Sequence, residues 1–273
     1  AIVETMLLLL CRSSNLQTVA AAAYGNCEPI DFEHVRYTSF PKKDWAANRE
    51  TRFSIFSTKG DDAICSKVEK VSRLFEDVAE FCLGITPYDK YKGHSAELIK
   101  DRQFHSARKL SADYVPLISG TNITPFYVSD SVSEWLKYGP WLGAPRERRF
   151  FTEPRIIVRQ IASGNPPRIF AGYTTKELYH SQIGFAMLAK RNSEVPLKLL
   201  LALLNSKLLN FYHGRRFLDR EKITFQKVLI ANVRKFPLAA SDKKICAAIL
   251  RVVDEIIQLK VANPAADTSV LEQ

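Results

Sequence analysis

The most constraining feature of this sequence is an apolar segment at residues 196–212, which reads PLKLLLALLNSKLLNFY. Pro196 at its start is typical of the first turn of a helix. The segment is too short to span a bilayer, and Lys198 and Lys207 interrupt it. A helix this apolar must therefore be buried inside the protein, and the residues before it must supply the surface that covers it.

Three strand candidates precede the apolar helix. Residues 154–161 and 168–173 flank a turn at 163–167, and residues 182–188 follow them. The turn residues are Ser-Gly-Asn-Pro-Pro, which favour chain reversal. The pattern predicts a small antiparallel or mixed sheet, with the helix at 196–212 packed against it.

Two other segments have the apolar spacing of amphipathic helices. Apolar side chains recur at helical spacing over residues 61–83, and Gly84 follows as a helix stop. The same spacing recurs over residues 241–260, where Ser241 is suited to the N-cap position. Together with the strand candidates, these helices predict an α+β fold.

The first residues read AIVETMLLLLC, in which the unbroken apolar run is short. Glu4 stands where a secretion signal has basic residues, so we expect neither a signal peptide nor a membrane span. Such a run suits a strand buried on both faces of a parallel sheet, which requires partner strands. Because there is also no initiator Met, we interpret the chain as a piece of a longer protein. A further short strand is expected over residues 52–57.

Sequence patterns for catalysis and metal binding are missing. There is no Glu-x-Lys of the metal-dependent nucleases, no Gly-x-Ser-x-Gly and no P-loop. The five His and five Cys lack the paired spacings of a zinc site, and we interpret the cysteines as reduced. Residues 165–167 read Asn-Pro-Pro, but Arg168 stands where amino-methyltransferases place an aromatic ring, so we interpret them as a turn. We therefore expect no catalytic residue, metal, cofactor or small-molecule substrate in this chain.

The net charge of +10 arises from one part of the chain. Residues 134–236 contain 19 Lys and Arg against 7 Asp and Glu, whereas the rest is close to neutral. Charge concentrated in this way indicates a face that meets a polyanion, and nucleic acid is the first candidate. Arginine predominates in the loops, and a guanidinium can fork onto a base edge or a phosphate. The alternative is that single arginines, such as Arg155 and Arg159, line the exposed face of a strand.

Four segments carry a resemblance to a known family: PLISGTNITPFY at 116–127, PRIIVR at 154–159, LLNSKLLNFY at 203–212 and RKFP at 234–237. In order and spacing they resemble the TaqI-like C-terminal specificity domain, the target recognition domain of restriction-modification proteins with an adenine-N6 methyltransferase. The segment at 203–212 is the most specific of the four. The similarity extends over roughly residues 62 to 258.

The resemblance implies that the chain consists of three parts. Residues 1–60 would be the C-terminal edge of an α/β methyltransferase domain with a linker, 61–240 the DNA target recognition domain, and 241–273 a C-terminal helix and tail. The implied function is sequence-specific binding of double-stranded DNA in the bacterial cytoplasm. The catalytic domain would lie in cis, outside this chain, and would transfer a methyl group from S-adenosylmethionine to adenine, with an endonuclease module in restriction enzymes. Two alternatives stay open: a stand-alone specificity subunit that recruits separate catalytic chains, and an RNA-binding or scaffold module.

Two loops, residues 137–149 and 213–222, are expected to carry the contacts to DNA. In such a domain lysines and arginines bind phosphates, while a few loop side chains read base edges in the major groove. The arginines expected to make bidentate contacts to a base or a phosphate are Arg146, Arg148, Arg149, Arg215 and Arg216. The other expected DNA-binding residues are Lys137, Tyr138, Arg220, Lys222 and Lys227.

Overall fold

A computed structural model describes residues 15–22, 33–47, 59–70, 73–132, 134–164, 166–218, 226–239 and 242–272. The chain divides into two compact units, Ala1–Ser66 and Lys67–Gln273. The strand expected at the start of the chain and the strand expected over residues 52–57 lie outside the described residues. The expected edge of a methyltransferase domain lies largely outside them as well.

The first unit contains a small two-stranded sheet. Its strands, β1 (Thr18–Ala21) and β2 (Thr38–Pro41), pair antiparallel. Helix α1 (Lys42–Ala47) follows directly, and the rings of Phe40 and Trp45 stack with 5.2 Å between their centroids. Trp45 is buried, so this ring pair forms an apolar contact between the strand and the helix.

The helix expected over residues 61–83 ends much earlier than the apolar spacing predicts. Helix α2 spans Lys59–Glu69 and is followed by β3 (Arg73–Leu74), the single turn α3 (Phe75–Val78) and β4 (Ala79–Leu83). Strand β4 pairs antiparallel with a later strand, with Phe81 opposite Met187. Short apolar runs fit a helix and a strand equally well, and here the long-range strand pairing decides.

The larger sheet of the second unit is mixed. Among the described residues it has six strands, in the order β4, β13 (Gly184–Ala189), β10 (Arg155–Arg159), β11 (Ala171–Thr174), β8 (Phe126–Val128) and β7 (Ile123–Thr124). All pairs are antiparallel except β11 with β8. The expected strands at 154–161, 168–173 and 182–188 are confirmed as β10, β11 and β13. Strands β10 and β13 are almost entirely buried, as expected from the apolar residues 156–158 and 184–188.

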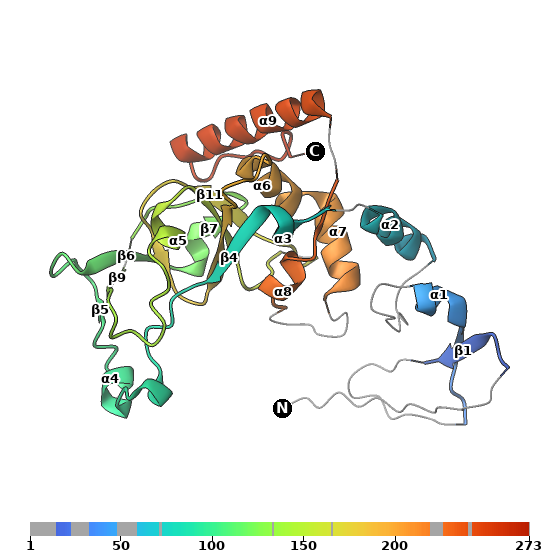
Figure 1. Ribbon diagram of the computed structural model, residues 1–273, viewed down its shortest axis with the longest axis horizontal. Coiled ribbons are helices and arrows are strands. Elements are labelled where there is room, and N and C mark those ends of the chain that lie inside the picture. Colours follow the sequence, from blue (N-terminus) through green and yellow to red (C-terminus); the bar gives the residue numbers. More distant parts are fainter. Residues whose placement is uncertain are drawn as a thin grey trace. The chain divides into compact units, whose positions relative to one another are not determined.

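A second sheet packs beside the first and shares its core. Its four strands among the described residues are, in order, β12 (Tyr179–His180), β6 (Tyr114–Ile118), β9 (Glu134–Lys137) and β5 (His105–Ser106). In Figure 1, β5 leads toward the short helix α4 (Ala96–Lys100) at the edge of this unit. Buried Val115 and Leu136, which face each other across β6 and β9, belong to one cluster with Leu188 of β13.

The apolar helix is buried against the larger sheet, as expected. Helix α6 (Leu197–Asn205) packs on β10, β11 and β8, and the C-terminal helix α9 (Lys243–Ala262) packs on α6 and β8. Helix α6 therefore lies between the sheet and α9, as Figure 1 shows. The helix expected over 196–212 is divided in two, because Ser206 has an extended backbone and its hydroxyl accepts a hydrogen bond from the Leu209 amide. Helix α7 (Lys207–Arg216) begins there.

Two asparagines of the segment at 203–212 join this helix break to strand β11. The side-chain amide of Asn205 accepts from the Ala171 N–H at 3.3 Å and donates to the Ala171 carbonyl at 2.9 Å. Asn210 accepts from the Ile169 N–H at 2.6 Å and donates to the carbonyls of Leu204 and Ser206. The most specific motif of the resemblance therefore fixes the helices to the backbone of the β10–β11 region.

An aromatic cluster lies next to β14 (Pro237–Leu238), the last strand described in the second unit. Helix α8 (Ile230–Val233) leads to β14, which pairs with β3. The buried ring of Phe236 lies at the centre of this cluster. Its neighbours, at ring distances of 5.8 to 6.0 Å, are Phe75, Tyr212, His213 and Phe217.

Candidate nucleic-acid interface

The first expected contact loop, residues 137–149, has a defined shape. It connects β9 to the short helix α5 (Arg149–Thr152). The Tyr138 hydroxyl donates to the Arg146 carbonyl at 2.8 Å, and Trp141 Nε1 donates to the Lys137 carbonyl at 3.0 Å. Arg146 has a φ of +67°, a left-handed conformation that persists in a non-glycine residue only where its surroundings hold it. The loop is therefore held by its own hydrogen bonds.

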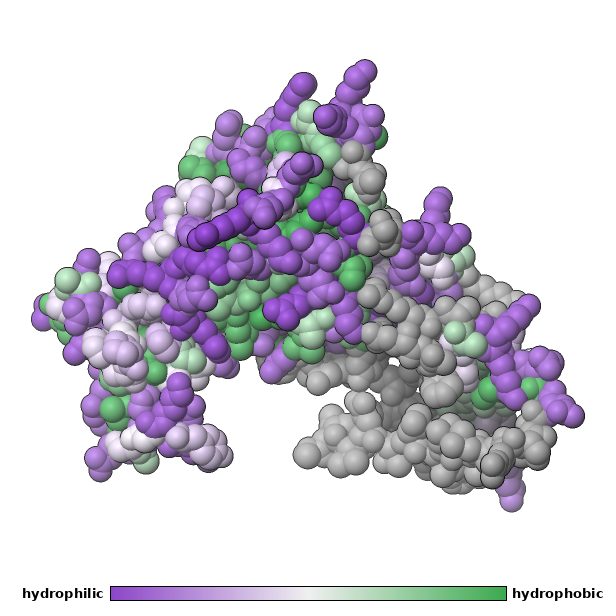
Figure 2. Space-filling model, in the orientation of Figure 1, coloured by the Kyte–Doolittle hydropathy of each residue, from purple (hydrophilic) through white to green (hydrophobic). Residues whose placement is uncertain are grey.

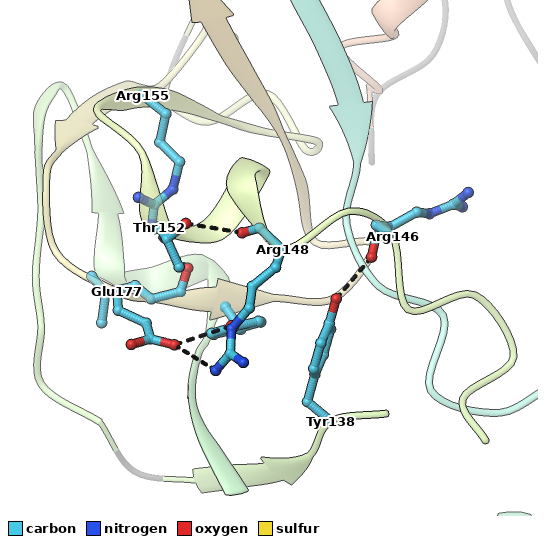
Figure 3. A network of polar contacts seen from close by, with 8 residues as sticks. Tyr138, Arg146, Arg148, Thr152, Arg155 and Glu177 are labelled. Carbon is cyan, nitrogen blue, oxygen red and sulfur yellow. Dashed lines mark hydrogen bonds and ion pairs between the residues drawn. The ribbon is translucent and has the colours of Figure 1, made fainter. Parts of the chain in front are cut away.

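Lys137 and Arg146 are the cations of this loop without a carboxylate partner among the described residues. The Lys137 ammonium lies 5.1 Å from the ring centre of Trp141, which is 39% exposed. Arg146 is exposed, and Figure 3 shows its side chain pointing away from Tyr138. Both side chains are available to bind an anion.

Arg148 is held along one edge of its guanidinium and exposed along the other. Its Nε donates to the Tyr179 hydroxyl at 2.9 Å, and its Nη2 donates to Glu177 at 3.2 Å (Figure 3). The Tyr179 hydroxyl also donates to Glu177, at 3.1 Å. These bonds raise the pKa of Arg148, with the Glu177 contact as the largest cause. Because the side chain is 60% exposed, an oriented N–H edge faces solvent.

Arg149 is enclosed by two carboxylates. Its Nη2 lies 2.5 Å from Glu80 of β4, and its Nε lies 2.8 Å from Glu147. The hydrogen bond that Arg149 donates to Glu80, and next the one it donates to Glu147, raises the pKa of Arg149. One arginine against two carboxylates is a net negative group, so Arg149 fixes α5 to the sheet and offers little to a phosphate.

The second expected loop is only partly described, because Arg220 and Lys222 lie outside the described residues. Arg216 does not have the exposure expected of a DNA contact: its side chain is 7% exposed, and its Nε lies 2.9 Å from Glu69 of α2. A buried ion pair of this kind has a structural role. The guanidinium carbon of Arg215 lies 5.1 Å from the ring centre of Phe211, and Lys227 is exposed.

Arg155 is fully buried, so the alternative that it lines the exposed face of a strand is wrong. Its guanidinium donates to the carbonyls of Glu153, Lys176 and Leu178 at 2.8 to 2.9 Å. Burial lowers the pKa of Arg155 to about 10. The carbonyls of Lys176 and Leu178 flank Glu177 in sequence. Arg155 therefore fixes the segment that carries Glu177, the ion-pair partner of Arg148 (Figure 3).

Two cations at the turn between β10 and β11 were not among the expected contacts. Arg159 and Arg168 lie over the same ring, that of Phe170, at 6.0 and 5.3 Å from its centre. From the sequence, Arg159 is expected only to line the exposed face of a strand. The signal available in the sequence was an arginine at each end of the turn with an aromatic residue beside it.

The described residues contain no group of three His, Cys, Asp or Glu that could hold a metal ion. None of the helices in those ranges is long and apolar enough to cross a membrane. Figure 2 shows hydrophilic side chains over much of the visible face of the second unit, with apolar side chains between them. The side chains described above offer hydrogen-bond donors and positive charge from arginine and lysine.

One part of the chain matches a known protein family. Residues 115–238 match the family model of the TaqI-like C-terminal specificity domain. No curated protein sequence matches the chain.

Three of the solved structures similar to the chain come from restriction-modification proteins. A chain from a structure of complex assembly and conformational transition in the type I restriction-modification system has 11% identity and a TM-score of 0.41, with 78% of this chain and 48% of that chain covered. The type IIG restriction endonuclease BpuSI has 9% identity and a TM-score of 0.47, with 81% of this chain and 31% of that chain covered. The HsdS subunit from Thermoanaerobacter tengcongensis has 11% identity and a TM-score of 0.41, with 77% of this chain and 46% of that chain covered.

The chain spans less than half the length of each of these three proteins. The expected α+β class, with small sheets backed by helices and a C-terminal helix, is confirmed. The resemblance seen in the sequence is confirmed as well, because residues 115–238 match the family model of the TaqI-like C-terminal specificity domain.

Proposed function

We propose that this chain recognises a specific sequence in double-stranded DNA, as the target recognition part of an adenine-N6 DNA methyltransferase or restriction enzyme. The observation that carries the proposal is the match of residues 115–238 to a specificity domain. The concentration of Lys and Arg in residues 134–236 supports it independently, because a duplex is a dense polyanion.

The catalytic chemistry belongs outside this chain in our proposal. A methyltransferase domain in cis binds S-adenosylmethionine and transfers its methyl group, and no residue described here is assigned to that cofactor. We propose residues 1–60 as the end of that domain with a linker, 61–240 as the recognition domain, and 241–273 as a C-terminal helix and tail. The whole protein acts in the bacterial cytoplasm, where its DNA substrate lies.

The two kinds of contact in the loop at 137–149 have different tasks. Lys137 and Arg146, which have no carboxylate partner among the described residues, bind phosphates and set the register of the domain on the duplex. Arg148 reads a base, because Glu177 and Tyr179 orient its guanidinium before DNA arrives. A bidentate arginine of this kind recognises the O6 and N7 atoms of guanine in the major groove.

Duplex binding is expected to weaken steeply with salt. If the chain neutralises about five phosphates, a plot of log affinity against log salt concentration has a slope of about −4 to −5. Fluorescence anisotropy of a labelled duplex, titrated at several NaCl concentrations, measures this slope. An affinity that does not change with salt would show that the basic residues do not contact the phosphate backbone.

Replacing Arg148 by Lys is expected to relax sequence preference while keeping the charge. Lysine cannot reproduce the planar fork, so discrimination at one G·C pair should fall by about 1–3 kcal/mol. The measurement is the affinity of the variant for the preferred duplex and for duplexes changed at each position. Arg146→Lys is the matched control, and it should keep the preference because a phosphate contact needs only the charge. Equal weakening on all duplexes by Arg148→Lys would show that Arg148 contacts a phosphate.

A further inference from the structure

The pair of arginines at the β10–β11 turn differs from three other arginines of the basic segment. Ion pairs with glutamates hold Arg148, Arg149 and Arg216. Arg159 and Arg168 have no carboxylate partner among the described residues. Their positive charges are therefore uncompensated within the part of the chain that the structure describes.

The backbone around the turn is held on both sides. Ser163 and Arg168 exchange two backbone hydrogen bonds, at 3.0 and 2.9 Å, which closes the turn. The segment around Lys227 pairs alongside it, with Lys227 opposite Ile161 and the Val228 N–H bonded to the Gln160 carbonyl at 2.7 Å. This pairing places exposed Lys227 next to the turn, where its side chain has no ion pair with a described residue.

The ring of Phe170 brings the two guanidinium groups together. Since each lies within 6.0 Å of the ring centre, the two charges are no more than about 11 Å apart. A guanidinium over an aromatic face gains about 0.5–1 kcal/mol at an exposed site, which limits the freedom of the side chain while its N–H groups stay available. Two oriented, uncompensated cations with a lysine beside them attract an anion with several acceptor oxygens.

We propose that Arg159, Arg168 and Lys227 form a binding site for the phosphodiester backbone of a bound duplex, separate from the loop at 137–149. The proposal rests on the proposed function, because a duplex supplies the phosphate. This site supplies affinity without sequence preference, whereas Arg148 supplies preference. Asn205 and Asn210 fix the position of the site through their bonds to the backbone of residues 169–171.

The test is the double variant Arg159→Gln/Arg168→Gln, measured on duplexes of mixed sequence over a range of NaCl concentrations. Loss of two phosphate contacts should reduce the magnitude of the log-log salt slope by about 2 and should weaken binding by about tenfold per arginine near 0.1 M salt. The loss should be the same for every duplex. The matched control is Lys243→Gln/Lys244→Gln at the start of α9, which removes the same charge from exposed residues and should leave the slope unchanged.

A second variant blocks the site and keeps both arginines. A Cβ at Gly120 would lie 3.6 Å from Arg159 Nε, an ordinary contact distance. Gly120→Asp therefore places a carboxylate beside Arg159, where it competes with a phosphate, while Gly120→Ala tests the added side chain alone. Weaker duplex binding is expected for Gly120→Asp only. Unchanged urea midpoints for all variants establish that they fold.

The outcomes separate the two proposals. If the wild-type chain binds duplexes with the expected slope and the double variant binds equally well, the phosphate site is wrong and the proposed function stands. If the wild-type chain binds no duplex, both fail. If inorganic phosphate alone binds the wild-type chain but not the double variant, while duplex binding of the two is equal, the turn is a site for a free anion and the proposal is overturned.

Discussion

Lowering the pH from about 6.5 to 4 is expected to destabilise the second unit of this protein steeply, because it buries two neutral histidines. Burial lowers the pKa of both His180 and His213 to about 4. The unfolded chain binds these protons near pH 6.5, so the stability is fully present above that pH and is lost as the pH falls toward 4. Each histidine should lower the free energy of unfolding by about 3 kcal/mol as the pH falls from 6.5 to 4.

The acid effect can be assigned to one side chain with His213→Leu. The Nε2 atom of His213 is buried without a hydrogen-bond partner among the described residues, and its ring packs on Phe217 and Phe236. Leucine should therefore be tolerated at neutral pH to within about 1.5 kcal/mol. Between pH 6.5 and 4 the free energy of unfolding of the variant should fall less steeply than that of the wild-type chain. The two slopes should differ by about 1.4 kcal/mol per pH unit. Urea unfolding followed by circular dichroism at each pH measures this, and identical slopes for the two proteins would contradict the assignment.

Replacing Arg155 by Ala is expected to cost about 3–5 kcal/mol of stability at neutral pH. The substitution leaves a cavity and removes the donor from three carbonyls, of which that of Leu178 is bonded in a buried environment. It also frees the segment around Glu177, so sequence preference that depends on Arg148 should fall. Urea unfolding at pH 7.5 measures the stability effect.

Arg159→Ala is the matched control for Arg155, because both residues lie on β10 and Arg159 is only half-buried. We expect it to change stability by less than about 1 kcal/mol. Arg155→Lys keeps a charge but reaches fewer carbonyls, so its stability should be intermediate. Equal stability losses for Arg155→Ala and Arg159→Ala would mean that the buried hydrogen bonds of Arg155 contribute nothing.

The parts of the fold that could be predicted from the sequence are those with strong local patterns. Strands β10 and β13 contain apolar runs, and α6 is an apolar helix that has to be covered. The division of the helix at Ser206 was not predicted, because the bonds that hold it include those of Asn205 and Asn210 to backbone groups 34 and 41 residues away. The strand β4 was mistaken for helix for the same reason, because its partner β13 lies about a hundred residues away.

The candidate site was predicted less well than the fold. Composition identified the basic segment, but the partner of each arginine depends on tertiary contacts between residues far apart in sequence. Glu80 reaches Arg149 across 69 positions, and Glu69 reaches Arg216 across 147. The uncompensated pair at the β10–β11 turn becomes visible only when these ion pairs are known.

The most direct test of the central claim is selection of bound duplexes from a pool of random sequence by this 273-residue chain, followed by sequencing. We predict that one short motif is enriched and that its duplex binds about 10³-fold or more tighter than duplexes of unrelated sequence. Retention of duplexes without any enriched motif, or no retention at low salt, would contradict the claim that this chain recognises a specific DNA sequence.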